Sequence, residues 1–384
     1  MPTPTTEIAI VGGGVVGTSI AWHLARRGAQ VTLIEERGIA AAASGASAGG
    51  IRQQGRDPRE MPLAIAAIAR WEHLEAELDA DIHYYREGHV SVYQREEDIP
   101  LARKRVEAQQ ALGLAIELVE GRDLHDLVPG LAEHIVAGTY TANDGHANPT
   151  LTTQAFARAA ERCGATIVQG TGVTGMLRDG DRVTGVETAG GPLAADHVVL
   201  TTGAWTRELV APLGVTLPIV PTGLQMILTT PMPALLRQVV GAYGRNLSLK
   251  QLRDGTYLIG GGWPGDIDLV AGVGTTRPES VAGSREVSSA IFPVLKETEI
   301  ERAWVGVEGI AVDEIPVIGA LPGIDGLTVA AGFSGHGFAL SPITGQLVAE
   351  LVLDGTPSLP LDAFGAGRFT EMDVDEGDLV PSTG

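Results

Sequence analysis

The pattern that most constrains this chain lies in its first fifty residues. An apolar run at 8–11 leads directly into the sequence GGGVVG at 12–17, and a second apolar run at 31–34 ends at Glu35. Between the two runs, residues 15–27 carry apolar side chains at helical spacing. The order is strand, glycine-rich turn, helix, strand and acid. This order predicts a Rossmann-type unit that binds an adenine dinucleotide.

The glycines of this turn have distinct expected roles. Gly12 permits the tight turn, Gly14 lets backbone amides approach a pyrophosphate at the positive helix N-terminus, and Gly17 lets helix and strand pack closely. Glu35 lies near the offset of about 20 residues expected for the carboxylate that accepts a ribose hydroxyl. These residues alone leave NAD and FAD open. The neighbours assigned to the same site are Val15, Val16, Glu36 and Arg37.

Composition limits the classes of protein to consider. A chain of 384 residues with 44% hydrophobic residues and 51 glycines is expected to be a globular α/β protein of two or three domains. The net charge of −20 argues against nucleic acid or an anionic membrane as partner. Cys163 is the only cysteine, so we expect no disulfide framework. We interpret it as a core residue at a helix end and expect a cytoplasmic protein without a membrane span.

Patterns after the first unit indicate a second domain. Residues 37–54 are rich in Ala, Gly and Ser, which suits a backbone cradle or a flexible linker. Residues 61–79 and 100–118 are predicted to be helices, and 90–93 a strand. From about 218 to 304, repeated strand patterns and turns predict an antiparallel sheet.

The first domain resumes twice in the sequence. A buried strand pattern at 197–200 precedes Thr202-Gly203-Ala204-Trp205, and another at 327–332 precedes a helix at 342–353. The two domains are therefore predicted to be interleaved. The cofactor domain would comprise 1–80, 147–217 and 310–365, and the substrate domain 81–146 and 218–309. Residues 366–384, a segment rich in acidic side chains, are expected to form a disordered tail.

Three motifs together resemble the FAD-dependent amine oxidoreductase family that includes D-amino acid oxidase, glycine oxidase and the sarcosine oxidases. They are the TGAW sequence at 202–205, DEIPVIG at 313–319 and GFSGHGF at 332–338. The resemblance covers residues 8 to about 353 and favours FAD over NAD. It implies an α/β fold in which a Rossmann-like FAD-binding domain is interleaved with an antiparallel-sheet substrate domain, with the flavin between the two.

The resemblance also implies roles for individual residues. Gly12, Gly14, Gly17 and Glu35 would hold the ADP half of the cofactor. The further implied contacts are Ser44, Ser47, Gly49 and Gly50 at the pyrophosphate and flavin, Val173 at the adenine, Thr202, Gly203 and Trp205 along the dinucleotide, and Gly335, His336, Gly337 and Phe338 at the reactive half. His336 either takes part in proton chemistry or only caps the following helix.

The chain departs from these relatives at substrate-binding positions. Glu308 stands where glycine and D-amino acid oxidases have a carboxylate-binding Arg, and Ala339 stands where sarcosine oxidases have a Lys. The cysteine that bonds covalently to flavin in some members is missing, so the FAD is expected to be non-covalent. Arg52 and Lys250 remain as candidate cations for a carboxylate. Arg52 could instead pair with an acid, Lys250 could be exposed, and Glu308 could favour a cationic substrate or be a surface charge.

The resemblance implies an enzyme that oxidises the C–N bond of a small amine or amino acid to an imine, by hydride transfer to flavin N5, after which water hydrolyses the imine. A secondary amine such as an N-alkyl glycine or cyclic imino acid is the first choice, and a D-amino acid the second. The alternatives are a flavin monooxygenase that uses NADPH and a flavin-bearing subunit or assembly factor without turnover. The electron acceptor, oxygen or another, and the oligomeric state stay open.

No metal site is expected, because His83 and His89 have no third ligand in sight.

Overall fold

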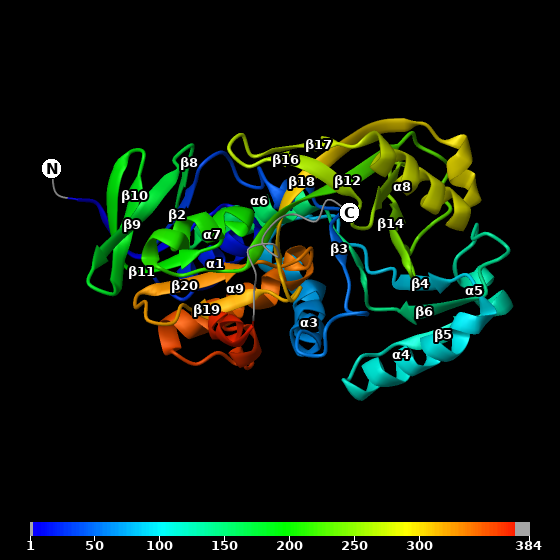
Figure 1. Cartoon of the computed structure of the whole chain (residues 1–384), viewed down its shortest axis with the longest axis horizontal. Helices are drawn as coiled ribbons and strands as arrows, with labels where there is room; N and C mark the ends of the chain where they lie inside the picture. The colour runs from blue at the N-terminus through cyan, green and yellow to red at the C-terminus, as the bar shows by residue number, and fades with distance from the viewer. Residues whose placement is uncertain (1–2, 373–384) are drawn as a thin grey trace.

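The computed structural model describes residues 3–372, and its strands fall mainly into two large sheets (Figure 1). The first sheet is built on parallel strands, with β19 antiparallel at its edge. It contains β19 (Val317–Ala320), β20 (Leu327–Ala331), β11 (Gly191–Leu200), β1 (Thr5–Val11), β2 (Val31–Glu35) and β8 (Thr166–Gln169) in that spatial order, with β10 (Arg182–Thr188) and β9 (Val173–Asp179) attached to β11.

Both faces of the first sheet are buried. On one face, Ile10 and Leu33 pack against helices α1 (Val15–Ala25), α3 (Met61–Leu78), α6 (Pro149–Arg162) and α9 (Gly337–Asp354). On the other face, Val11 and Ile34 pack against the β9–β10 hairpin and α7 (Thr206–Val210). This two-sided cover explains why these strands are almost continuously apolar in the sequence.

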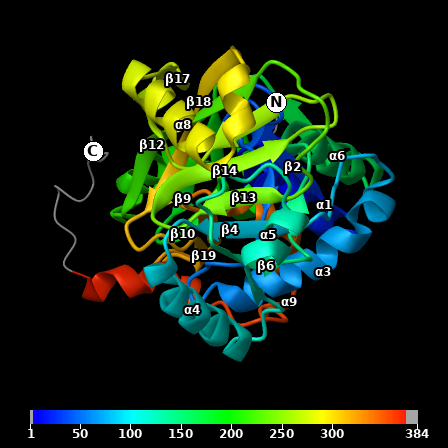
Figure 2. The same ribbon diagram turned by 90° about the vertical axis from the view of Figure 1, so that its right-hand side faces the viewer.

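The second sheet is mostly antiparallel and forms the other domain. It runs β17 (Val273–Thr276), β16 (Pro264–Asp268), β12 (Ile219–Thr229), β15 (Tyr257–Gly260), β14 (Arg245–Gln251), β13 (Val239–Ala242), β4 (His89–Tyr93), β6 (Ala137–Thr141) and β5 (Glu117–Glu120), and β18 (Ile300–Ala311) pairs with β12. Figure 2 looks onto this domain, where β14, β13, β4 and β6 run side by side.

One face of the second sheet forms a core with α5 (Gly121–Leu127) and α8 (Pro278–Ile291), through residues such as Ile227, Leu249 and Ile259. Side chains alternate along a strand, so the intervening residues point to the opposite face. That face meets the first domain, since Trp304 donates a hydrogen bond to the carbonyl oxygen of Ala46 at 2.9 Å.

The remaining elements lie outside the two large sheets. They are α2 (Ala43–Ala46), α4 (Ile99–Ala111), the two-stranded pair β3 (Gly50–Ile51) and β7 (Gly145–His146), and the short 3-10 helices η1 (Glu96–Asp98), η2 (Gly203–Trp205), η3 (Ala211–Leu213), η4 (Pro293–Glu297), η5 (Asp362–Phe364) and η6 (Ala366–Glu371). No helix within residues 3–372 is long and apolar enough to cross a bilayer.

Two predicted elements differ in the structure. The helix expected over 100–118 ends at Ala111, because Gly113 adopts φ +92, and residues 117–120 form β5 instead. Cys163 lies at the end of α6 as expected but is exposed, so its assignment to the core is wrong.

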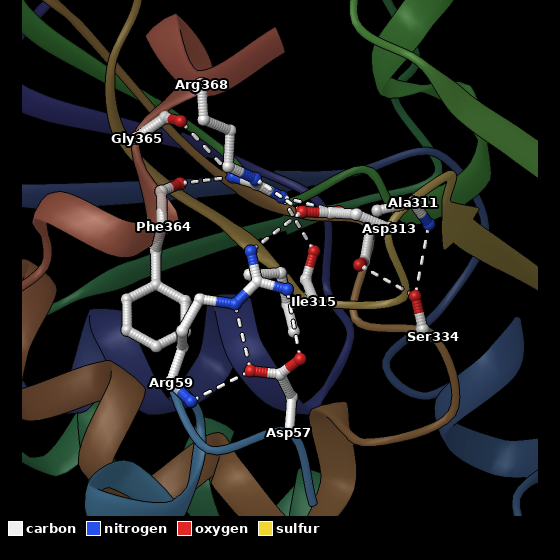
Figure 3. A network of polar contacts seen from close by, with 10 residues as sticks. Asp57, Arg59, Ala311, Asp313, Ile315, Ser334, Phe364, Gly365 and Arg368 are labelled. Carbon is white, nitrogen blue, oxygen red and sulfur yellow. Dashed lines mark hydrogen bonds and ion pairs between the residues drawn. The ribbon is translucent and has the colours of Figure 1, made fainter. Parts of the chain in front are cut away.

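The start of the expected disordered tail is also structured. Residues 366–371 form η6, and the guanidinium of Arg368 binds the carboxylate of Asp313 with N–O distances of 2.9 and 3.1 Å (Figure 3). Arg368 also donates to the carbonyl oxygens of Ile315, Phe364 and Gly365. The expectation of disorder therefore fails for this segment, whereas residues 373–384 lie outside the described residues. Asp313, which belongs to one of the resemblance motifs, has a structural partner here.

Candidate functional site

A cavity of about 460 Å³ opens at the carboxyl ends of β1, β2 and β11 and extends to the second domain. This edge of a parallel sheet is where Rossmann-type folds bind dinucleotides. Its lining includes the predicted residues Gly12, Gly14, Val15, Val16, Glu35, Glu36, Arg37, Ser44, Ser47, Val173, Thr202, Gly203, Trp205, Glu308, Gly335, Gly337 and Phe338.

The turn between β1 and α1 has no room for side chains. Gly12 adopts φ +111, and a Cβ there would lie 2.7 Å from the carbonyl oxygen of Thr201. A Cβ on Gly17 would lie 2.1 Å from the carbonyl oxygen of Gly12. The N–H of Val15, at the start of α1, donates to Ser44 Oγ at 2.9 Å. The N-terminus of α1 thus faces the cavity, and the Ser44 hydroxyl beside it keeps its own proton to donate, an arrangement that suits an anion.

Glu35 lies at the end of β2 and is held in place by two backbone groups. Its carboxylate accepts hydrogen bonds from the N–H of Gly13 at 2.7 Å and from the N–H of Arg37 at 2.8 Å. It lines the cavity together with Val173 and Thr171, and the N–H of Thr171 donates to the carbonyl oxygen of Glu35 at 3.0 Å. The role of Glu35 as acceptor for a ribose hydroxyl stays a prediction.

The other end of the cavity is closed by both domains. Gly335, Gly337 and Phe338 come from the start of α9, and Val307 and Glu308 come from β18. The N–H of Gly335 donates to Glu308 Oε1 at 3.3 Å. Burial raises the pKa of Glu308 to about 7. A carboxyl group that titrates near neutral pH therefore faces the cavity, and the interpretation of Glu308 as a surface charge does not hold.

Three predicted glycines lie outside the cavity wall. Gly17 is inside α1, where its lack of a side chain serves the contact with Gly12 described above. Gly49 has φ +67, and a Cβ there would lie 2.2 Å from the carbonyl oxygen of Ala147. Gly50 pairs with His146 between β3 and β7. These glycines shape the chain around the cavity without lining it.

Three predicted polar residues, Lys250, Arg52 and His336, also lie outside the wall of the cavity. Lys250 is 3% exposed, and its Nζ donates to the carbonyl oxygen of Ala48. Burial lowers the pKa of this lysine to about 7. Within residues 3–372 it has no carboxylate partner in an ion pair. It is therefore not the exposed lysine that the sequence allowed.

We expect Lys250→Met to stabilise the protein against unfolding by roughly 2 kcal/mol at pH 7, because a buried unpaired ammonium is replaced by an apolar chain of similar size. The folded-state pKa lies below the usual 10.5, so the unfolded chain binds this proton more tightly. The gain should be complete below about pH 7 and disappear as the pH rises towards 10.5. Urea unfolding at pH 7 and pH 10 tests this, with the exposed Lys104→Met as control. Equal gains at both pH values would contradict it.

Arg52 and His336 belong to a buried polar cluster that sequence reasoning largely missed. His336 Nδ1 lies 3.0 Å from Oε1 of Glu60, whose side chain is fully buried. Arg56 is 7% exposed and its Nε donates to the carbonyl oxygen of Arg52 at 3.1 Å. Asp144, just before β7, is fully buried and accepts hydrogen bonds from the backbone N–H and the side-chain amide of Gln53.

Burial and the neighbouring charges shift the pKa values of the residues in this cluster. Burial, reinforced by Arg52, lowers the pKa of Arg56 to about 9. Burial and Arg56 together lower the pKa of His336 to about 4, against the opposing effect of Glu60. Burial raises the pKa of Asp144 to about 6. The sequence gives little indication that these residues are buried, because Arg56 and Glu60 lie in a polar stretch that resembles an exposed loop.

No group of three or more His, Cys, Asp or Glu side chains among residues 3–372 is arranged to hold a metal ion. His83 is exposed, and His89 is buried with its Nδ1 2.8 Å from Gln54 Nε2.

Comparison with known proteins identifies the family. The family model described as FAD dependent oxidoreductase matches residues 7–351. The chain belongs to this family. The glycine oxidase of Pseudomonas aeruginosa is 31% identical over 376 residues, covering 94% of this chain and 99% of the relative.

Solved structures of this FAD-dependent oxidoreductase family share the fold. L-proline dehydrogenase from P. horikoshii superposes with a TM-score of 0.90 at 29% identity, covering 96% of this chain and 99% of that one. Glycine oxidase from Geobacillus kaustophilus gives 0.87 at 27% identity, covering 95% and 99%. The predicted family, two-domain fold and FAD cofactor are confirmed, and the protein is an enzyme of the glycine oxidase and sarcosine oxidase type that acts on an amine or amino acid.

The residues present fit FAD. The turn at Gly12 and Gly14, where side chains would block the approach, faces a helix N-terminus. One continuous cavity joins this turn to the start of α9. The cavity therefore extends beyond the part expected to hold ADP and has room for the flavin half of FAD.

Proposed function

We propose that the enzyme oxidises the C–N bond of a small amine or amino acid to an imine, which water then hydrolyses. A secondary amine, such as an N-alkyl glycine or a cyclic imino acid, is the preferred substrate, and a D-amino acid is the next. The observation that carries this proposal is the single cavity that joins the α1 turn to the start of α9 and to Glu308. Similarity to an L-proline dehydrogenase supports a secondary amine, since proline is one.

Bound FAD supplies a two-electron acceptor for the hydride of the carbon beside nitrogen. The chain would hold it non-covalently, with the α1 N-terminus and Ser44 at the pyrophosphate and with Gly335, Gly337 and Phe338 at the flavin half. The amides at the start of α9 would stabilise negative charge there. Glu308 would face a cationic group of the substrate. Arg52 and Lys250 are the proposed cations for a carboxylate; both lie outside the cavity wall in the structure, so each would have to leave its present backbone partner to reach one.

Anaerobic bleaching of the visible flavin spectrum by a panel of amines tests this function. Reduction by an amine alone is the expected result. Reduction only by NADPH would instead indicate a flavin monooxygenase. No reduction by any of these compounds would indicate a flavin-bearing subunit or assembly factor without its own turnover. Exposing the reduced protein to air, or to an artificial dye, then distinguishes an oxidase from a dehydrogenase.

We expect Arg52→Ala to raise the apparent KM for amines that carry a carboxylate by roughly 10-fold or more, because hydrogen bonds to a charged group contribute about 1.5–3 kcal/mol. In the structure the Arg52 side chain folds back on the carbonyl oxygen of Gln54, so substrate would have to draw it away. Steady-state kinetics on an amino acid and on the matching amine without a carboxylate check this. An equal effect on both substrates would refute the role.

A further inference from the structure

The hairpin formed by β16 and β17 in the substrate domain reaches the cofactor domain (Figure 1). Its last ladder pair joins Asp268 to Val273, which leaves residues 269–272 at the tip. The side chain of Val270 is fully exposed, with a relative exposure of 102%, so burial of this residue does not hold the tip in place.

Two hydrogen bonds tie the tip to the cofactor domain. Trp205 Nε1 donates to the carbonyl oxygen of Leu269 at 3.0 Å, and Arg37 Nη1 donates to the carbonyl oxygen of Gly272 at 2.8 Å. The Arg37 guanidinium also lies 5.4 Å from the centroid of the Trp205 ring, within cation–π range. We call this set of contacts the hairpin clasp: residues 269–272 together with Arg37 and Trp205.

The clasp lies at one particular end of the cavity. Arg37 and Trp205 both line the cavity. The N–H of Arg37 donates to the Glu35 carboxylate at 2.8 Å, so the clasp lies beside the acid expected at the ribose. The tip residues do not line it. They act through backbone carbonyl oxygens on two side chains that do, and are therefore positioning residues.

We propose that the hairpin clasp is a second contribution of the substrate domain to the FAD site, besides β18: it holds Arg37 and Trp205 against the adenine end and so retains the cofactor. Release of FAD then requires the tip to leave the first domain. This inference depends on FAD as cofactor and not on the proposed amine substrate, so either can fail without the other.

Two variants open the clasp from opposite sides. Trp205→Phe keeps an aromatic ring but removes the Nε1 donor. Gly272→Ala places a Cβ 2.6 Å from Arg37 Nη1 and should displace that guanidinium. Diluting the holoenzyme and measuring the fluorescence of released FAD gives the dissociation constant, and ADP added as competitor gives its own. Each variant should weaken FAD by about 5- to 10-fold, equivalent to about 1–1.4 kcal/mol, and ADP by the same factor.

Matched controls separate the clasp from general damage. Trp263 also donates its Nε1 to a backbone carbonyl, that of Asn246 at 2.9 Å, but both residues lie in the substrate domain, so Trp263→Phe should leave FAD affinity within twofold. Gly244 has φ +68, close to the +64 of Gly272, with no atom near the methyl group that alanine would add, so Gly244→Ala reproduces the backbone strain alone. FAD affinity in the clasp variants equal to that of these controls would overturn the proposal. So would a loss of FAD affinity with no change for ADP.

Discussion

Replacing Gly17 by alanine is expected to weaken FAD binding by at least about 100-fold, which corresponds to about 2.7 kcal/mol. The added Cβ would lie 2.1 Å from the carbonyl oxygen of Gly12 and 2.5 Å from Thr201 Oγ1. Neither neighbour can easily move, because Gly12 is fixed at φ +111 and itself packs against Thr201. Helix α1 must therefore shift away from β1, and its N-terminal amides move with it.

The ratio of visible flavin absorbance to protein absorbance after purification measures this loss, and titration with FAD gives the constant. Gly175→Ala is the control, because Gly175 lies in β9 of the same sheet with no atom near its added methyl group and no positive φ. Circular dichroism should show that both variants keep their secondary structure. A Gly17→Ala protein that retains FAD as well as Gly175→Ala does would contradict the close-packing role of Gly17.

The cofactor half of the site was predictable because its constraints are local. The turn at Gly12 and Gly14 is specified by residues next to one another in sequence, and Glu35 follows one helix later. The rest of the predicted cofactor site depends on motifs distant in sequence, at 202–205 and 332–338, and the structure brings residues of both to the cavity wall. A periodic pattern and a turn with no side chains need no knowledge of tertiary packing.

The polar residues around the proposed reaction site were harder to place, since burial depends on contacts between segments distant in sequence. Lys250 is buried because the carbonyl oxygen of Ala48, in the other domain, lies against its strand. Glu60 is fully buried and lies against His336, the residue before α9. Nothing in the local sequence distinguishes these side chains from exposed charges.

The predicted ends of structured segments were wrong where a tertiary contact or a single glycine determines where the segment stops. Arg368 is structured by its ion pair with Asp313, which no composition argument for an acidic tail could include (Figure 3). The helix from Ile99 ends early because Gly113 adopts a left-handed conformation, although the apolar pattern continues beyond it. Sequence periodicity predicts which segments are regular better than it predicts where they stop.

Glu308→Gln is expected to lower kcat/KM for amines with a second cationic group by roughly 10- to 100-fold, because a desolvated hydrogen bond between charged groups contributes about 1.5–3 kcal/mol. For a monoamine of equal length, kcat/KM should change little. The isosteric amide can keep the hydrogen bond from Gly335, so the cavity wall should be preserved.

The preference of the enzyme for a diamine over a monoamine should also depend on pH. Since the pKa of Glu308 is about 7, the carboxylate is mostly neutral at pH 6 and mostly charged at pH 8. The preference of the natural enzyme for a diamine over the monoamine should therefore grow as the pH rises through 7, and the Glu308→Gln variant should lose this growth. Glu208→Gln, which alters an exposed carboxylate on α7 that lines the same cavity, should retain it. A preference that rises equally in all three proteins would show that Glu308 does not recognise the second charge of the substrate.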